Sequence, residues 1–302
     1  MAVIPKELQD YVLKQVDVAR LIPKRNRASH KGTYGRAAIV AGSIDYTGAA
    51  YLSAAACLRS GAGYTVLFVP SEILPHYILK APEVILKCSN EGSRYALNEE
   101  IMRQVCEYDA VAYGMGMGVS EAVADGAAWL LRRYQGKLIL DADGLNSLSV
   151  YKKEGFSALL KNAKCDVLLT PHIKEYSRIV TACGWEDNRA CAAVQKFAAA
   201  HSVTILLKDY YSVITNGESV AVNAAGNSGQ AKAGSGDVLS GVIVGLCAQG
   251  ANGFGGGCAG AFLCGSAAEL AAEKVGEYSL TATDCIAHLG GAFLALKEYG
   301  LQ

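Results

Sequence analysis

The sequence has little of what marks linkers, nucleic-acid-binding surfaces or exported chains. Only 6 of its 302 residues are proline, and no proline-rich, serine-rich or charge-run stretch divides the chain. Lysine plus arginine, 28, equals aspartate plus glutamate, 28, so the formal net charge is zero and no basic stripe could neutralise a row of phosphates. We therefore expect no nucleic-acid partner and a single domain over residues 1–302, with residues 1–25 as an N-terminal extension.

Paired cysteines and a long uncharged apolar segment are also missing. The ten cysteines include no Cys-x-x-Cys pair, and most stand in apolar runs, which indicates reduced thiols instead of a zinc site or a disulfide framework. Lys6, Glu7 and Asp10 stand where a signal peptide needs an apolar core, and the apolar stretch Gly255–Ala272 contains Glu269. We expect a cytoplasmic protein that does not insert into a membrane.

Short apolar, β-branched runs recur with helical patterns between them. Such alternation predicts an α/β fold with a mostly parallel sheet covered on both faces. The expected strands are Ala37–Ala41, Thr65–Val69, Val84–Leu86, Ala110–Tyr113, Leu138–Leu140, Val167–Leu169 and Thr204–Leu207. Tyr211–Thr215 and Ser219–Val222 flank Asn216-Gly217, a hairpin signal, so the sheet should gain an antiparallel edge.

Helical patterns dominate the last part of the chain. Asp237–Gln249, Gly257–Lys274 and Thr283–Lys297 are rich in alanine, leucine and glycine. This composition indicates either close helix packing or a subunit interface. A further helix is expected near the start, from about Pro5 to Gln15.

The strongest functional signal is Ala233-Gly234-Ser235-Gly236-Asp237, directly before the apolar helical run at 238–243. Glycines let backbone N–H groups converge and a helix start adds positive dipole, so this loop suits a transferring phosphoryl group. Asp237 could orient or deprotonate an attacking hydroxyl. The alternative is an ordinary helix start with Asp237 near the cap position. A Walker A loop is excluded, because Ser235 stands where the lysine should be.

Other glycine-rich or polar loops follow the remaining strands, where ligands bind in open α/β sheets. The run at 114–118, Gly-Met-Gly-Met-Gly, is an incomplete dinucleotide fingerprint because residue 119 is valine. It indicates either a tight turn or close approach of the backbone to a ligand. Asp141, Asp143 and Asn146 could reach a metal ion or a ribose hydroxyl, but the same residue types favour turns.

Two more polar segments have both a functional and an ordinary interpretation. Thr170-Pro171-His172, with Glu175 after it, could place a polar group over a ligand, although a single loop histidine is more often structural. Lys208-Asp209 could contact a nucleotide phosphate or sugar, or simply form a solvated loop.

In order along the chain, these segments resemble one family from about residue 26 to the C-terminus. The family is the ADP/ATP-dependent NAD(P)H-hydrate dehydratases, relatives of ribokinase. The matching stretches are HKGTYGRAAIVAGS, TGAAYLSAAACLRSGAG, YGMGMG, LILDADGLN, LLTPHIKE, ILLKD, GNSGQAKAGSGDVLSG and SLTATD. The resemblance implies a three-layer α/β/α sandwich of the ribokinase type. It also implies a stand-alone dehydratase without the epimerase domain of the larger bifunctional members.

The resemblance also implies roles for individual residues and ligands. Asp237 would be the catalytic residue. An anion hole would be formed by Ala233, Gly234, Ser235 and Gly236. The hydrated dinucleotide would lie against Ala37, Gly116, His172 and Asp237, and ADP or ATP against Lys208, Asp209, Tyr210, Tyr211, Ser212 and Gly236. Mg²⁺ would be the expected ion and a homotetramer the expected assembly.

The implied reaction dehydrates the S epimer of NADH or NADPH hydrate. Asp237 would take the proton of the ring hydroxyl while the loop amides hold the transferring phosphate, and the phosphate ester formed would then be expelled. Ile173-Lys174 replaces the family's usual Pro-Gly, and Asp209 replaces its usual glycine. The choice between ADP and ATP stays open. So do a kinase of a vitamin-precursor alcohol, of the hydroxyethylthiazole or pyridoxal type, and a non-catalytic nucleotide-binding module.

Overall fold

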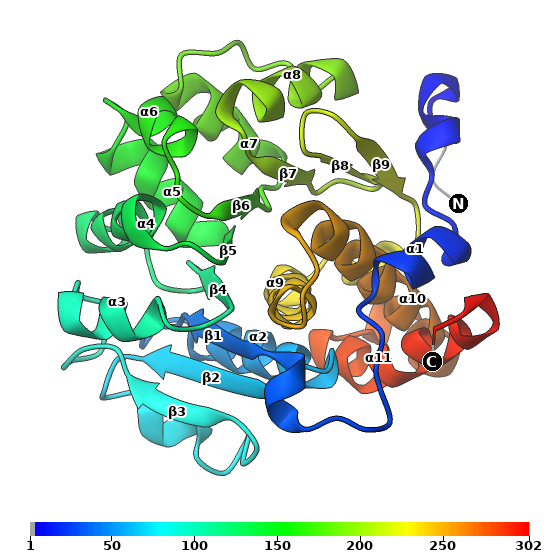
Figure 1. Ribbon diagram of the computed structural model, residues 1–302, viewed down its shortest axis with the longest axis horizontal. Helices are drawn as coiled ribbons and strands as arrows, with labels where there is room; N and C mark the ends of the chain where they lie inside the picture. The colour runs from blue at the N-terminus through cyan, green and yellow to red at the C-terminus, as the bar shows by residue number, and fades with distance from the viewer. Residues whose placement is uncertain (1–3, 302) are drawn as a thin grey trace.

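A nine-stranded sheet forms the centre of the protein in a computed structural model that describes residues 4–301 (Figure 1). The strand order is β3-β2-β1-β4-β5-β6-β7-β8-β9, parallel up to β7 and antiparallel from β7 to β9. The strands are β1 (Arg36–Val40), β2 (Tyr64–Val69), β3 (Ile85–Cys88), β4 (Ala110–Tyr113), β5 (Lys137–Leu140), β6 (Asp166–Leu169), β7 (Thr204–Leu207), β8 (Ser212–Thr215) and β9 (Val220–Asn223). The expected parallel strands and the hairpin edge are confirmed.

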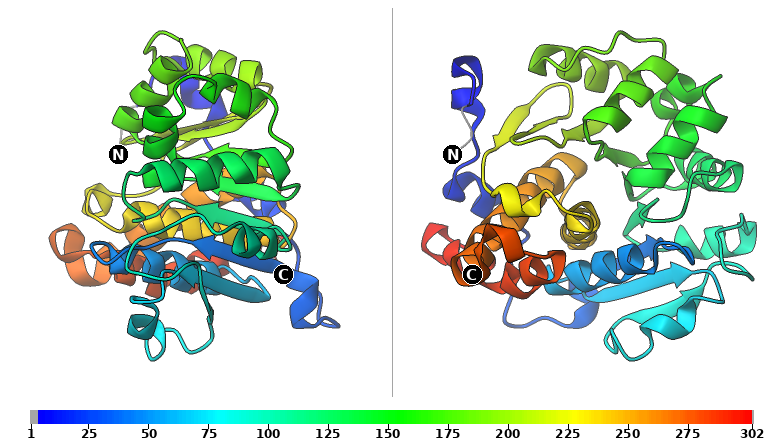
Figure 2. Two further views of the ribbon diagram at one scale, coloured as in Figure 1. Left: turned by 90° about the vertical axis from the view of Figure 1, so that its left-hand side faces the viewer. Right: turned by 180° about the vertical axis from the view of Figure 1, so that it is seen from behind.

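Helices cover both faces of the sheet, which makes three layers (Figure 2). The helices are α1 (Gln15–Leu21), α2 (Thr47–Arg59), α3 (Glu99–Val105), α4 (Glu121–Arg133), α5 (Ala142–Tyr151), α6 (Phe156–Lys161), α7 (Ile173–Ala182), α8 (Cys191–His201), α9 (Ser235–Ala248), α10 (Gly253–Ser279) and α11 (Ala282–Ala295). One face carries α2, α9 and α10, with α11 packed outside them, and the other face carries α3 to α8. Because side chains alternate along a strand, Ile39 belongs to the first core and Val40 to the second.

Helix α9 lies so close to α2 that only glycine fits at the contact. A Cβ on Gly241 would lie 2.2 Å from the carbonyl oxygen of Ser53, and a Cβ on Gly245 would lie 2.1 Å from Ser60 Oγ. All residues of α9 from Val238 to Ala248 are buried. For this helix, the glycine content therefore serves close packing within the chain.

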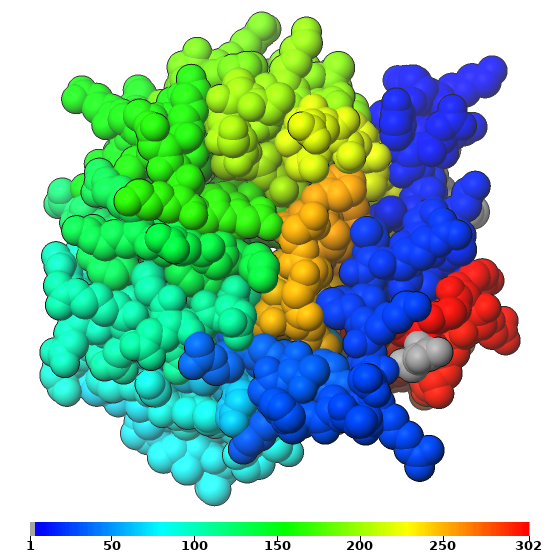
Figure 3. All heavy atoms as spheres, in the orientation of Figure 1, coloured from blue at the N-terminus to red at the C-terminus, as the bar shows by residue number. Residues whose placement is uncertain are grey.

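The N-terminal segment does not form the single helix expected from about Pro5 to Gln15. It forms a short 3-10 helix, η1 (Lys6–Tyr11), then an extended stretch, and then α1. In the extended stretch Val12 pairs with Val222 of β9, and the Leu13 amide donates to the Val222 carbonyl at 2.9 Å. A helix through these residues would lose this pairing, which covers the otherwise open edge of the sheet. Figure 3 shows the blue N-terminal segment beside the red C-terminal end.

Two further expectations concern cysteine and membranes. All ten cysteines are free thiols, five of them buried, and burial raises the pKa of Cys57 and Cys247 to about 12. Between residues 4 and 301, none of the helices has both the length and the apolar character needed to span a bilayer.

The sheet topology also indicates where a ligand would bind. The chain adds strands outward from β1 to β3, then returns to the other side of β1 with β4 and continues outward. The strand order therefore reverses between β1 and β4, and in open α/β sheets ligands bind outside the carboxyl ends of strands at such a point. The loops that follow β1, β4, β5, β6 and β7 meet there.

Candidate active site

Asp141 is the buried centre of the polar groups at this edge of the sheet. It directly follows β5, is 2% exposed, and uses both carboxylate oxygens. Oδ1 accepts a hydrogen bond from Lys208 Nζ at 2.8 Å, and Oδ2 accepts one from Ser240 Oγ at 2.7 Å. Asp141 therefore joins the end of β7 to helix α9. The predicted alternatives for this residue, a metal or ribose ligand and a turn former, did not include this role.

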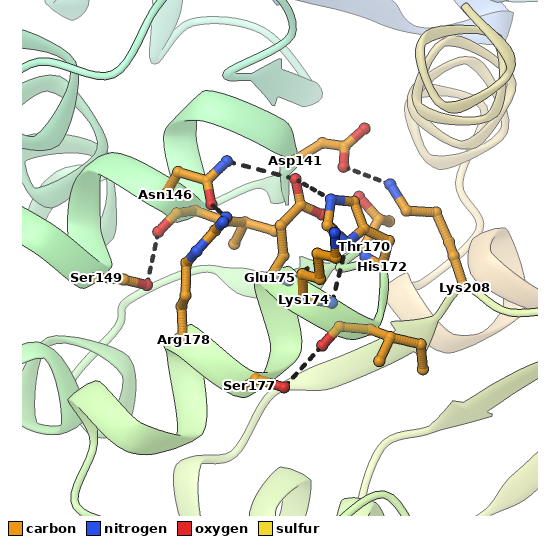
Figure 4. A network of polar contacts seen from close by, with 12 residues as sticks. Asp141, Asn146, Ser149, Thr170, His172, Lys174, Glu175, Ser177, Arg178 and Lys208 are labelled. Atoms are coloured by element: carbon orange, nitrogen blue, oxygen red, sulfur yellow. Dashed lines mark hydrogen bonds and ion pairs between the residues drawn. The ribbon is translucent and has the colours of Figure 1, made fainter. Parts of the chain in front are cut away.

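Lys208 carries the positive charge of the site. It directly follows β7, and its side chain is 21% exposed and points toward Asp141 (Figure 4). Burial lowers the pKa of this ammonium, but the carboxylates of Asp141 and Glu175 outweigh burial and hold the pKa above its usual value. Lys208 is therefore a charged group inside the site, in contrast to the solvated-loop alternative.

The loop at 233–236 forms the start of α9. Gly234 is the N-cap residue, in the left-handed region at φ 98°, with no side-chain cap. The first amides of a helix have no acceptor within the helix and lie at the positive end of its dipole. A Cβ on Gly236 would lie 3.6 Å from Lys208 Nζ. The structure thus brings the predicted anion loop against the lysine.

Asp237 lies in the first turn of α9, two positions past the first helical residue and not at the cap itself. Burial is the largest cause that raises the pKa of its carboxyl, to about 7; the nearby Asp141 and Asp143 add to the shift and Lys208 opposes it. A carboxyl that titrates near neutral pH can accept a proton at that pH and release it again. This is the property a general base needs.

In the glycine run at 114–118, contacts at Gly114 and Gly116 are too tight for a side chain. Gly114, Gly116 and Gly118 all have positive φ. A Cβ on Gly116 would lie 2.7 Å from the Cβ of Ala49, and the Gly116 carbonyl accepts from Ser43 Oγ at 2.8 Å. The run therefore forms a tight turn packed on the loop after β1, at the same edge of the sheet as Asp141. The Gly118 amide donates to Asp143 Oδ2 at 2.8 Å.

His172 caps helix α7. Its Nδ1 accepts from the amides of Lys174 and Glu175 at 3.1 and 3.3 Å, and the Glu175 carboxylate accepts from the His172 amide at 2.9 Å. Because Nδ1 is an acceptor, Nε2 carries the proton, and it lies 3.4 Å from Glu175 Oε1. His172 also forms a parallel bridge with Lys208. With Ile173-Lys174 in place of Pro-Gly, helix α7 is thus still well capped and begins beside Lys208.

The residues after Lys208 run along the surface toward the hairpin. Asp209 Oδ1 accepts from the Tyr210 amide at 2.8 Å, so the carboxylate that replaces the family glycine turns back on its own loop. Tyr210 is 64% exposed, and its ring meets that of Tyr211 edge to face at 4.6 Å between centroids. Ser212 begins β8.

Ala37 is the one predicted site residue that the structure places elsewhere. It is fully buried within β1 and pairs with Ala110, the first residue of β4. The glycine run begins only after the last residue of β4, so Ala37 lies toward the opposite edge of the sheet. The side chain of Ala37 is part of the core under the helices, and its contact with a substrate stays a prediction.

Metal binding can be judged from the donors present. Across residues 4–301, no group of three histidine, cysteine, aspartate or glutamate side chains is placed to hold a metal ion. Mg²⁺, however, usually keeps several waters and binds one or two carboxylates together with phosphates of the substrate. Asp143 offers such a carboxylate, and burial raises its pKa. The donor set fits an ion that enters with a nucleotide.

Known proteins are similar to this chain in sequence. A family model for NAD(P)H-hydrate dehydratase matches residues 37–289. The ADP-dependent (S)-NAD(P)H-hydrate dehydratase of Neisseria meningitidis is 34% identical over 256 residues, which cover 83% of this chain and 82% of that protein. The bifunctional NAD(P)H-hydrate repair enzyme of Moorella thermoacetica is 34% identical over 92% of this chain, and the chain spans about half, 52%, of its length.

Solved structures share the fold. The ADP/ATP-dependent NAD(P)H-hydrate dehydratase of Bacillus subtilis, co-crystallized with ATP and Mg²⁺, matches with a TM-score of 0.77 and 26% identity over 94% of this chain and 98% of that one. A ribokinase-like superfamily protein of Enterococcus faecalis matches with a TM-score of 0.79 and 22% identity over the whole of both chains. The predicted ribokinase-like α/β/α sandwich is confirmed. The chain belongs to the NAD(P)H-hydrate dehydratase family.

Proposed function

We propose that this protein dehydrates the S epimer of NADH hydrate and NADPH hydrate and consumes ADP or ATP in the reaction. The observation that carries the proposal is the part-buried Asp237 carboxyl, with a pKa of about 7, next to the 233–236 loop and Lys208. Family membership supports the choice of substrate, since the Neisseria relative is named for this activity. The reaction would be that of a hydro-lyase.

The chemistry requires help because hydroxide is a poor leaving group. Asp237 would take the proton of the hydroxyl on ring carbon 6, and the hydroxyl oxygen would attack the terminal phosphorus of the nucleotide. The bond from that phosphorus to the nucleotide breaks, which leaves ADP or AMP and a phosphate ester on the ring. The ring nitrogen lone pair then expels phosphate, and loss of a proton from ring carbon 5 restores the reduced nicotinamide.

The residues divide between the two ligands as follows. The amides at Gly234, Ser235 and Gly236 would hold the transferring phosphate. The nucleotide would extend from there along Lys208–Ser212, where the exposed Tyr210 ring offers a flat surface for a base. The nicotinamide end of the substrate would lie between Gly116, His172 and Asp237. When bound, Mg²⁺ would neutralise phosphate charge, and Asp143 is the carboxylate available to hold it.

We also propose where the enzyme acts and in which oligomeric state. The enzyme would act in the cytoplasm as a homotetramer. Mass measurement by light scattering at micromolar concentration tests the assembly, and a monomeric mass would rule it out.

The discriminating experiment is a product analysis. The purified protein is given NADH hydrate with ADP or ATP in separate reactions, and then a hydroxyethylthiazole or pyridoxal-type alcohol with the same nucleotides. The proposal expects inorganic phosphate with the hydrate and no stable phosphate ester with the alcohols. A phosphorylated alcohol without hydrate turnover would establish a kinase instead. Nucleotide binding without either product would establish a non-catalytic module.

A further inference from the structure

The ion pair of Lys208 and Asp141 lies directly against the 233–236 loop. A Cβ on Gly236 would lie 3.6 Å from Lys208 Nζ and 3.9 Å from Asp141 Oδ2. Because glycine has no side chain, the ammonium faces the bare backbone where the loop amides converge. A cation at this position adds to the field of amides and helix dipole that already favours an anion.

The lysine is held in place by more than one element. Asp141 accepts from Lys208 with one oxygen and from Ser240 with the other, at 2.8 and 2.7 Å. Ser240 is fully buried and follows Asp237 by three residues on α9, so both lie on the same side of the helix. The position of the ammonium is therefore tied to the helix that carries the catalytic carboxyl.

We propose that the Lys208 ammonium binds the phosphoryl group in transfer, and that Asp141 and Ser240 are positioning residues that hold it there. This inference rests on the proposed function and deepens it. Among residues 4–301, the structure gives Lys208 Nζ a hydrogen bond to Asp141 alone. An ammonium has three donors, so the other two remain for phosphate oxygens.

The charges around Lys208 give its ammonium two effects, one on the phosphate of the nucleotide and one on the Asp237 carboxyl. Three carboxylates act on the ammonium: Asp141 after β5, Glu175 on α7 and Asp237 on α9. A fourth, Asp143 after β5, acts on Asp237. The His172 ring lies beside Glu175, with Nε2 3.4 Å from Glu175 Oε1. Without the ammonium, these carboxylates would repel a phosphate. The ammonium also favours the charged form of Asp237, which Asp141 disfavours.

The first test measures nucleotide binding by calorimetry and needs no hydrate turnover. ADP, ATP and AMP are titrated into the wild type, Lys208→Met, and Lys196→Met, an exposed lysine on α8 that serves as the control. Lys208→Met should weaken ADP and ATP binding at least about tenfold more than AMP binding, since AMP lacks the transferred phosphoryl group. Equal losses for all three nucleotides, or no loss, would overturn the role of Lys208. This result is independent of whether hydrate is the substrate.

The second test measures turnover of Asp141→Asn and Ser240→Ala. The control is Ser149→Ala, a buried serine whose hydroxyl donates to the Leu145 carbonyl within α5. Both site variants should lower kcat at least about tenfold and weaken the binding of ADP and ATP by less than Lys208→Met does, because the lysine remains but is misplaced. An unchanged kcat in both variants would refute the positioning role. Ser240→Ala keeps the ion pair and guards against a folding failure in Asp141→Asn.

The pH dependence of kcat separates this role from a merely structural one. Removal of the Asp141 charge should lower the pKa of Asp237 and move the acid limb of the profile to lower pH. Removal of the Lys208 charge should raise that pKa and move the limb to higher pH. Profiles that only scale down, with the acid limb unmoved in both variants, would contradict the inference.

Discussion

At Asp237 the fold keeps a carboxyl group in surroundings that disfavour its charge. Burial and the neighbouring carboxylates raise its pKa to about 7, from the ordinary value of 3.8. A carboxylate with that pKa is a better base at neutral pH than an exposed one. Its ionisation in these surroundings lowers the free energy of unfolding. Activity and stability should therefore respond in opposite directions when this residue is changed.

Asp237→Asn should lower hydrate turnover at least ~10²-fold, the low end of a general-base contribution. Nucleotide affinity should be retained, because the 233–236 amides and Lys208 are untouched. Steady-state phosphate release and calorimetry measure the two quantities. Near-normal turnover of the purified variant would remove Asp237 from the mechanism.

The same substitution should stabilise the folded chain, to a degree that depends on pH. The unfolded chain loses the Asp237 proton near pH 4 and the folded chain only near pH 7, so ionisation subtracts stability progressively across this range. Asp237→Asn should come close to the wild type in free energy of unfolding at pH 4 and exceed it by about 4 kcal/mol at pH 8. Urea unfolding at the two pH values measures the difference. A variant less stable than the wild type at pH 8 would contradict the raised pKa.

Gly234 tests the anion loop itself. Its φ is 98°, and a Cβ there would lie 2.7 Å from Leu52 Cδ1 and 3.0 Å from the Cβ of Ala282. Gly250 has a similar φ of 116°, open space around it and a place at the far end of α9, which makes it a matched control. Both Gly→Ala variants should lose about 1–2 kcal/mol of stability, but only Gly234→Ala should lose nucleotide-dependent turnover, by about tenfold or more. Equal turnover of the two variants would show that this loop does not hold the phosphate.

The glycine loop, Asp237 and His172 could be recognised from the sequence as candidate site residues, whereas the pattern around Asp141 is typical of both a ligand and a turn former. What decides its role is a lysine 67 positions away and a serine 99 positions away. Ser240 was not singled out at all, because it looks like one more small residue in an apolar helix. Its spacing of three from Asp237 was the available signal. Ala37 was carried over by resemblance alone, and its contact with a substrate stays a prediction, since its side chain is buried in the core.

Among the secondary-structure elements, the strands were predicted nearly residue by residue. Parallel strands buried on both faces are continuous apolar runs, so their pattern needs no knowledge of their neighbours. The N-terminal segment was mispredicted because its extended part depends on pairing with Val222, about two hundred residues away. A local helical pattern carries no information about such a partner.

The contact between helices α2 and α9 predicts how a substitution at Gly241 changes stability. Gly241→Ala would force its Cβ to within 2.2 Å of the Ser53 carbonyl oxygen, so the helices must separate. The cost should be about 1–3 kcal/mol of unfolding free energy. Gly290→Ala in α11, with nothing within 4 Å, should be neutral or stabilising by up to about 1 kcal/mol. Thermal and urea unfolding measure both, and a harmless Gly241→Ala would refute the tight contact.

At the scale of the whole molecule, the sheet and its helix layers together place the residues of the candidate site. Parallel pairing places the carboxyl ends of β1, β4, β5, β6 and β7 at one edge of the sheet. Helix α9 packs on β1, β4 and β5 from one face of the sheet, and its start places the 233–236 loop and Asp237 beside these strand ends. This arrangement suits transfer of a phosphoryl group to a hydroxyl held nearby, with the nucleotide as a stoichiometric reagent.

The most direct measurement follows the ultraviolet absorbance of the reduced nicotinamide ring and phosphate release in the same reaction. NADH hydrate and NADPH hydrate are each supplied with ADP or ATP, and intact NADH and NAD⁺ serve as controls. The proposed function predicts one reduced cofactor restored for each phosphate released from either hydrate. It predicts no phosphate from the intact cofactors, which have no hydroxyl on carbon 6. Phosphate release without recovery of absorbance, or recovery without nucleotide, would contradict it.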